Sequence, residues 1–255
     1  CDMPWKRKGN VIINVLSLLA QKVSFFILLY NAKKLFVYNT LEGNNIADIF
    51  IKKGFNKNRI YFVNNGINYR KIHRIANRKK IYDACFVGGL RASKGIDDLI
   101  PIWKRVCARK KNAKLAIAGE RSNEITRELI TQITTKRLTK NIELFGAVDS
   151  DSLIKLMKSS RVFISTSHEE GWGIALCEAM ACGIPVVSYD LKVFERFKEY
   201  IELVAENNYV EFAETVGNIL NGELDMTKMT KSGEKFISQF DWDKIADREY
   251  KLLNL

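Results

Sequence analysis

The sequence predicts an α/β fold in which helices cover both faces of a parallel sheet. Three observations support this prediction. From residue 82 onward, short apolar runs alternate with longer segments of helical periodicity, at the spacing of strand–helix units. Gly, Ser or Thr follows most of these runs, as at the turns that end parallel strands. Apolar residues make up 47% of the 255 residues, which is enough for a packed core.

The regular part of the chain contains expected strands that are separated by helices. The strands are expected at 83–89, 114–119, 142–146, 162–166 and 184–188. The helical patterns lie at 96–110, 123–138, 151–159 and 173–182. Parallel sheets of this kind bind ligands beyond the carboxyl ends of their strands. The residues at those ends are Gly88, Gly89, Gly119, Gly146, Ser165 and Thr166.

The first third of the chain predicts a smaller strand–helix–strand unit. A strand is expected at 33–39, a helix at 41–54 and a second strand at 59–66. Residues 68–80 are rich in Arg and Lys and lack an apolar period, so we interpret them as a linker.

Three regions are therefore expected, 1–80, 81–240 and a terminal amphipathic helix at 241–255. The apolar contacts of that helix would come from Phe240, Trp242, Ile245, Tyr250, Leu252 and Leu253.

The net charge of +12 is concentrated in the first region. Residues 1–80 hold 16 Lys and Arg against 3 Asp and Glu, whereas residues 81–255 hold 25 against 26. This surplus is either a solvated basic face or a surface for an anionic membrane or a phosphorylated substrate. No helix-turn-helix, RNA-binding or zinc-finger signature accompanies the charge, so nucleic acid is not an expected partner.

Residues 11–30 are strongly apolar, but Lys22 interrupts them and the polar residues recur at helical spacing. This pattern favours a helix packed on a sheet over a helix in a membrane interface, and both over a membrane span. No small-residue cleavage site follows, so we expect no signal peptide. Five cysteines without a CxxC pair indicate a reduced, cytoplasmic protein. The two histidines lack partners at ligand spacing, so no metal is expected.

The segment SHEEGWGIALCEAMACGIPVV, residues 167–187, has the clearest chemistry. Gly171 and Gly173 form a turn, and a helix is expected to begin near 173–174 and end at Cys182. The unpaired N–H groups and the dipole at its start would attract an anion, or Glu170 itself would cap it. Glu178 lies inside the helix among small apolar residues, where a carboxylate needs donors such as sugar hydroxyls.

Several other signals have structural explanations. Asp149 and Asp151, and likewise Asp241 and Asp243, stand at expected helix starts, where Asp is a favoured cap. His168 is either a general acid or base or a surface residue beside the site. The remaining candidates are Cys177 and Cys182, which we interpret as core residues, and Trp172, which either stacks on a ligand or packs.

The segment HEEGWGIALCEAMACGIPVV closely resembles the Glu-x7-Glu region of retaining GT-B glycosyltransferases of family 4, also called glycosyl transferases group 1. CFVGGLRASKGIDDLI, KLAIAGE and IELFGAVDSDSLIKLMKSSRVFISTS are similar to other parts of that family, in its order. RIYFVNNGINYRKI resembles the strand and turn before the domain linker. The resemblance covers about residues 34–254. It implies a Rossmann-like parallel-sheet donor-binding domain and the closing part of a second Rossmann-like domain.

The resemblance also implies a reaction, the transfer of a sugar from a nucleotide diphosphate sugar with retained configuration. Glu170 and Lys94 would be catalytic: Glu170 beside the donor sugar, Lys94 neutralising the leaving diphosphate. Glu178 would accept the ribose hydroxyls. The other expected donor-binding residues are Gly171, Trp172, Gly173, Ile174, Gly89, Arg91, Gly119, Gly146 and Ser167. In such enzymes the lysine replaces a metal, so no cofactor is expected.

Two departures from the family pattern matter. Gly89 stands where the family usually has an arginine, and Arg91 is the candidate substitute. Residues 1–80 resemble only the end of the family's first domain, so we expect an amino-terminally truncated chain. The acceptor would be a glycan or lipid-linked, and the protein cytoplasmic, peripheral at the inner membrane face. The alternative is a non-catalytic fragment that binds nucleotide or docks on a membrane.

Overall fold

A computed structural model of the chain describes residues 31–38, 41–120 and 123–253, and positions 20, 23, 24 and 27. The apolar stretch 11–30 lies almost wholly outside the described residues. Contacts divide the chain into two compact units, residues 1–64 and 65–255.

The smaller unit contains a two-stranded parallel sheet with an α-helix and a short helix between its strands, among the residues described. The elements are β1 (Leu35–Tyr38), α2 (Leu41–Lys52), the short helix η1 (Lys57–Arg59) and β2 (Ile60–Val63). The register runs from Leu35 opposite Ile60 to Tyr38 opposite Val63. After α2, Gly54 adopts a φ of 92°, a left-handed conformation that suits glycine at the end of a helix. The expected strand–helix–strand order is confirmed.

The larger unit is built on a six-stranded parallel sheet in the order β5-β4-β3-β6-β7-β8. Its strands are β3 (Tyr82–Val87), β4 (Leu115–Ala118), β5 (Ile142–Gly146), β6 (Ser160–Ser165), β7 (Val186–Tyr189) and β8 (Glu202–Val204). The chain winds outward from β3 through β4 to β5, and then from β6 through β7 to β8. The sheet therefore has its topological switch point between β3 and β6, where open α/β sheets bind ligands.

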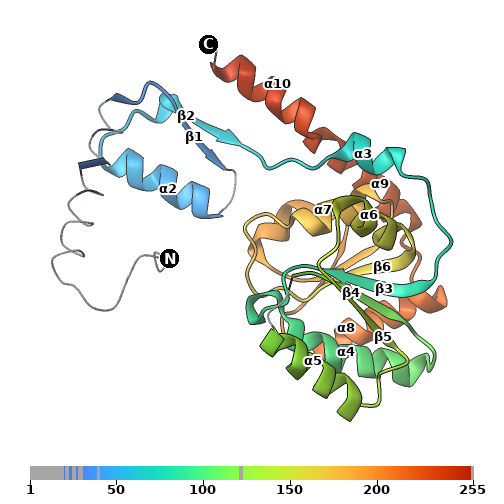
Figure 1. Ribbon diagram of the computed structural model, residues 1–255. Helices are drawn as coiled ribbons and strands as arrows, with labels where there is room; N and C mark the ends of the chain where they lie inside the picture. The colour runs from blue at the N-terminus through green and yellow to red at the C-terminus, as the bar shows by residue number, and fades with distance from the viewer. Residues whose placement is uncertain are drawn as a thin grey trace, which may run out of the picture. The chain divides into compact units, whose positions relative to one another are not determined.

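Helices cover both faces of this sheet, as Figure 1 shows. One face carries α4 (Ile96–Arg109), α5 (Asn123–Thr135) and α8 (Tyr209–Asn221). The other carries α3 (Tyr69–Arg74), α6 (Ser150–Lys158), α7 (Ile174–Ala181), α9 (Thr227–Ile237) and α10 (Trp242–Leu253). The short helices are η2 (Ala92–Lys94), η3 (Lys192–Phe197) and η4 (Ser238–Phe240).

Alternation along the central strand divides the core into two clusters. Ala84 and Phe86 of β3 belong to the cluster under α4 and α8, whereas Cys85 and Val87 belong to the cluster under α7. Each cluster is apolar because both faces of the sheet are covered by helices. The three-layer α/β architecture predicted from strand–helix alternation is confirmed.

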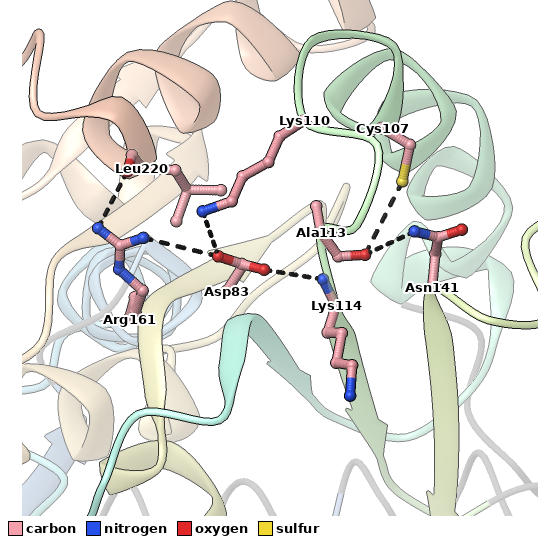
Figure 2. A network of polar contacts seen from close by, with 8 residues as sticks. All are labelled: Asp83, Cys107, Lys110, Ala113, Lys114, Asn141, Arg161 and Leu220. Carbon is pink, nitrogen blue, oxygen red and sulfur yellow. Dashed lines mark hydrogen bonds and ion pairs between the residues drawn. The ribbon is translucent and has the colours of Figure 1, made fainter.

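A network around Asp83 joins the amino ends of the strands, away from the switch-point loops (Figure 2). The Asp83 carboxylate accepts hydrogen bonds from Lys110 Nζ at 2.8 Å and from the backbone N–H of Lys114 at 2.9 Å. It also forms an ion pair with Arg161 at 3.6 Å. These contacts link β3, the end of α4, the start of β4 and β6. Asp83 therefore has a structural role at the amino ends of the strands, and the candidate site is sought at their carboxyl ends.

Residues 65–80 differ from the predicted irregular linker. They contain α3, whose start is capped by Asn68: its side chain accepts a hydrogen bond from the Lys71 N–H. The Ile67 N–H donates to Phe240 O, and the Trp242 N–H donates to Ile67 O. These bonds tie the segment to the larger unit. The boundary between the units thus falls at residue 64 rather than at the expected residue 80.

The terminal helix forms, but it buries fewer of its apolar residues than expected. Ile245 is buried and Phe240 lies buried just before the helix. Tyr250 and Leu253 are largely exposed, and Trp242 is about half exposed, at 47%. The Asp241 carboxylate accepts from the Asp243 N–H at 3.1 Å, which confirms its role as a cap.

Two glycines at the switch-point edge allow a test of packing. A Cβ at Gly119 would lie 1.8 Å from Gly88 O, whereas a Cβ at Gly89 would meet no atom within 4 Å. We expect Gly119→Ala to lower the free energy of unfolding by roughly 1–3 kcal/mol or more, since the backbone must move. Gly89→Ala should change it by less than about 1 kcal/mol. Urea unfolding of both variants measures this, and equal losses would contradict the packing described.

Candidate functional site

Two loops meet at the switch point. One follows β3 and spans residues 88–95; the other follows β6 and spans residues 166–173. The N–H groups of His168 and Glu169 both donate to Ser93 O, at 3.0 and 3.2 Å, and Thr166 Oγ1 donates to Gly95 O at 2.8 Å. A Cβ at Gly95 would lie 1.8 Å from Thr166 O, so only glycine permits this approach. We call these two segments the paired loops.

An ion pair joins the paired loops. Lys94 Nζ lies 2.5 Å from Glu170 Oε1, and both side chains are mostly buried, with 16% and 17% of their surface exposed. Ser167 Oγ also donates to Glu170 Oε1, at 3.0 Å, and Lys94 Nζ donates to Glu169 O at 3.4 Å. Partial burial strengthens the attraction between the charges relative to a pair in water. The structure thus brings together three predicted site residues, Lys94, Ser167 and Glu170.

The start of α7 lies directly after this pair. The helix begins at Ile174, and Gly173 before it has a φ of 84°. A Cβ at Gly173 would lie 2.6 Å from the Phe194 ring, so the turn requires glycine both for its φ and for its packing. The helix has no side-chain cap and no acid in its first turn. Glu170 therefore does not cap it, because its carboxylate is committed to Lys94 and Ser167.

The N–H groups of residues 171–176 find no acceptor in the part of the chain that the structure describes. Four such groups are left unpaired at any helix start, and the helix dipole adds a partial positive charge there. Gly171 is exposed, and a Cβ there would meet no atom within 4 Å. A negatively charged ligand could reach these donors beside the Lys94 ammonium.

Glu178 lies on α7, half-buried. Burial raises the pKa of its carboxyl to about 7. Among the described residues, no hydrogen-bond donor or cation contacts it, which explains why desolvation is unopposed. An ionised carboxylate held without donors is costly, and a ligand that supplies hydroxyl groups would offset that cost.

Trp172 packs in the core. Its side chain is buried, and its ring lies edge-on to Phe197 and Phe240, with centroids 6.1 and 5.5 Å away. The indole Nε1 has no hydrogen-bond partner among the residues that the structure describes. Of the two alternatives for this residue, packing agrees with the structure, and only its backbone N–H remains available to a ligand.

The other predicted donor-binding residues lie around the same edge. Arg91 is exposed, and its side chain forms no hydrogen bond or ion pair in the described part of the chain. A Cβ at Gly89, two residues earlier, would meet no atom within 4 Å. Ile174 is 48% exposed at the helix start. The Gly119 N–H donates to Gly146 O at 2.8 Å, so that donor is already used. Gly146, with a φ of 69°, ends β5 as the sequence indicated.

The structure confirms the predicted structural roles of Asp149 as a helix cap and of Cys177 and Cys182 as core residues. The Asp149 carboxylate caps α6, accepting from the N–H groups of Asp151 and Ser152. Cys177 and Cys182 are buried, and burial raises the pKa of the Cys182 thiol to about 12 and that of Cys177 well above its ordinary value. Protonated buried thiols are poor nucleophiles.

No group of three or more His, Cys, Asp or Glu residues with metal-binding geometry occurs among the described residues. The same residues contain no helix that is long and apolar enough to cross a membrane.

Sequence reasoning missed the backbone acceptor that holds the paired loops together and the partners of His168. Ser93 acts through its carbonyl, which has no sequence signature. His168 contacts Asp98 and Glu206, which lie 70 and 38 positions away in the sequence. Asp98 stands among the first residues of α4, where an acid is expected for the helix dipole alone.

Comparisons with known proteins agree on one family. A family model described as "Glycosyl transferases group 1" matches residues 67–236. Among curated relatives, the phosphatidylinositol N-acetylglucosaminyltransferase gpi3 subunit of Schizosaccharomyces pombe is 26% identical over 168 residues, covering 65% of this chain and 36% of the relative. The poly(ribitol-phosphate) alpha-N-acetylglucosaminyltransferase of Staphylococcus aureus is 25% identical over 245 residues, covering 92% and 45%. The chain therefore spans less than half the length of these two relatives.

A solved structure of S. aureus TarM, in complex with Fondaparinux, alpha-GlcNAc-glycerol and UDP, matches with a TM-score of 0.73. Its sequence identity is 20%, and the match covers 93% of this chain and 47% of that chain. At this identity the likeness concerns the fold.

The raised pKa of Glu178 predicts how stability changes with pH. Because its pKa is about 7 in the folded protein against an ordinary 4.5, the folded protein binds the proton more tightly. The resulting stabilisation is complete below pH 4.5 and is lost as the pH rises through 7. We expect the wild type to lose roughly 1–2 kcal/mol relative to Glu178→Gln between about pH 5.5 and 8.5, measured by urea unfolding. Parallel pH profiles for the two proteins would show that Glu178 is not desolvated.

Proposed function

Because this chain belongs to the glycosyl transferases group 1 family and its fold is of the GT-B type, we propose that it is the donor-binding part of a retaining glycosyltransferase. The donor would be a nucleotide diphosphate sugar. One observation carries the proposal: the Lys94–Glu170 pair adjoins the open N–H groups at the start of α7, at the switch point of the sheet. UDP in the TarM complex is consistent with a nucleotide ligand.

The diphosphate of the donor would lie against the start of α7. There the N–H groups of residues 171–176 and the Lys94 ammonium offer fixed positive charge. When the bond between the anomeric carbon and the diphosphate oxygen breaks, the bonding electrons stay with that oxygen. Charge therefore grows on the diphosphate in the transition state, and a fixed cation beside it speeds departure. In this proposal Lys94 supplies the stabilisation, and the reaction needs no metal.

The two glutamates would hold opposite ends of the donor. Glu178, which has no donor among the described residues, would accept hydrogen bonds from the ribose hydroxyls, and that would offset the cost of its burial. Glu170 would face the sugar from the paired loops. Its present partner is Lys94, so an arriving diphosphate must share this lysine with Glu170.

The proposal extends to the acceptor and to the location of the protein in the cell. Both curated relatives are named for phosphate-containing acceptors, phosphatidylinositol and poly(ribitol-phosphate). We propose a glycan or lipid-linked acceptor for this protein as well. The basic surplus of residues 1–80 would then favour an anionic membrane surface, at the cytoplasmic face. Co-sedimentation with anionic but not with neutral vesicles at low salt is the measurement for this part.

The function itself is tested with a panel of UDP-, GDP- and ADP-sugars. We expect one nucleotide class to bind and its sugar nucleotide to be hydrolysed or transferred, with nucleotide release unchanged by EDTA. Lys94→Met should slow release at least about tenfold, because the leaving group loses its cation. Binding without any release, also with added acceptor lipids or glycans, would favour the alternative of a non-catalytic nucleotide-binding fragment. No binding to any member of the panel would contradict the proposal.

The Lys94–Glu170 ion pair predicts opposite effects on binding and turnover. Glu170→Gln removes a negative charge beside the proposed anion site and releases Lys94. We expect affinity for inorganic pyrophosphate to rise roughly three- to tenfold, since a competing charge is gone, while donor turnover falls. Glu169→Gln is the matched control, because it removes the same charge from an exposed neighbouring position. Calorimetric titration measures both variants, and weaker pyrophosphate binding in Glu170→Gln would contradict the proposed anion site.

A further inference from the structure

The His168 side chain bridges two carboxylates instead of facing solvent freely. Its Nε2 lies 3.1 Å from Asp98 Oδ2, and its Nδ1 lies 2.5 Å from Glu206 Oε1. Only 28% of the side chain is exposed. Both ring nitrogens therefore face protein carboxylates rather than a ligand. The structure therefore disfavours the general acid or base role that the sequence allowed.

Asp98 is the centre of this arrangement. Only 6% of the surface of Asp98 is exposed. Its carboxylate accepts hydrogen bonds from the hydroxyls of Tyr189 and Tyr209, both at 2.8 Å. Burial raises the pKa of Tyr189, and the hydrogen bond to Asp98 raises that of Tyr209, so both hydroxyls stay protonated and donate. A buried carboxylate with two hydroxyl donors and an imidazole nitrogen 3.1 Å away has little freedom to move. We call these residues, Asp98, Tyr189 and Tyr209, the Asp98 hub.

The hub joins three elements of the larger unit. Asp98 comes from the first turn of α4, Tyr189 from the end of β7 and Tyr209 from the start of α8. Glu206 lies in the connection from β8 to α8. The Asp98 side chain therefore connects the start of α4, the end of β7 and the start of α8.

His168 is the link between this hub and the paired loops. Its ring contacts Asp98, and its backbone N–H donates to Ser93 O at 3.0 Å. Ser93 directly precedes Lys94, and Glu170 follows His168 by two residues. The same residue thus holds one loop by its main chain and the sheet edge by its side chain.

We infer that His168 is a positioning residue, which fixes the paired loops on the Asp98 hub so that Lys94 and Glu170 keep their geometry. The expected effect on turnover rests on the proposed function, whereas the expected effect on the position of the loops does not. A misplacement of about 1 Å at reacting groups can cost on the order of a hundredfold in rate. Side chains that orient such groups are therefore effective without touching the substrate.

The test compares His168→Ala with Tyr209→Phe in the full chain. Tyr209→Phe removes one hydrogen bond from the hub but leaves the contacts of His168 in place. Amide hydrogen exchange, followed by mass spectrometry, reports on the N–H groups of residues 168 and 169 that are bonded to Ser93 O. We expect His168→Ala to speed their exchange at least about tenfold, and Tyr209→Phe to change it less than about twofold.

Donor kinetics supply a second measurement. In His168→Ala we expect kcat to fall roughly ten- to a hundredfold with KM for the donor changed less than about threefold, because alignment rather than binding is lost. Glu206→Ala breaks the other half of the bridge at a more exposed position and should show a smaller effect of the same kind. If His168→Ala does not fold, Glu206→Ala replaces it in both measurements.

Three outcomes would overturn the inference: unchanged exchange at residues 168 and 169 in both His168→Ala and Glu206→Ala, equal effects of His168→Ala and Tyr209→Phe, or a loss confined to KM. The proposed function fails separately, by absence of donor binding and turnover in the wild type. In that case the exchange comparison alone still decides whether His168 positions the loops.

Discussion

The ion pair between Lys94 and Glu170 is the interaction on which the rest of this site depends. Its two charges come from loops that follow β3 and β6, and these strands are neighbours in the sheet although they are far apart in the chain. Two opposite charges that are mostly withdrawn from water hold each other in place more firmly than a surface pair. The close approach of Gly95 to Thr166 makes this distance possible. Without it, neither charge would have a defined position.

The surrounding architecture leaves one side of this pair unsatisfied. Among the described residues, the N–H groups at the start of α7 have no acceptors, and the carboxylate of Glu178 further along the helix has no donors. Buried carboxylates rarely lack partners, and the N–H groups at a helix start are available to a ligand. A ligand that is anionic at one end and hydroxylated at the other would pair with both. A nucleotide diphosphate has this combination, and the fold places the groups at a switch point, where such ligands bind in open α/β sheets.

Local features were predictable from the sequence and long-range ones were not. The turn at Gly171–Gly173, the start of α7 and the cap at Asp149 follow from neighbouring residues. The resemblance to a family identified Lys94, but nothing in the sequence indicated that this lysine contacts Glu170. Helix α3 was missed because it has a single buried residue, Ile72, and so no apolar period. The role of Ser93 was also unpredictable, because its backbone carbonyl accepts the hydrogen bonds, and every residue has such a carbonyl whatever its side chain.

The central claim is that one ligand is held at both ends, its diphosphate at the start of α7 and its ribose at Glu178. Titration of Glu178→Ala with a nucleoside diphosphate and with inorganic pyrophosphate tests this most directly. The account predicts that affinity for the nucleoside diphosphate falls about tenfold or more, the loss of one or two charge-assisted hydrogen bonds, while pyrophosphate binds as before. Equal losses for the two ligands, or no loss for either, would contradict it.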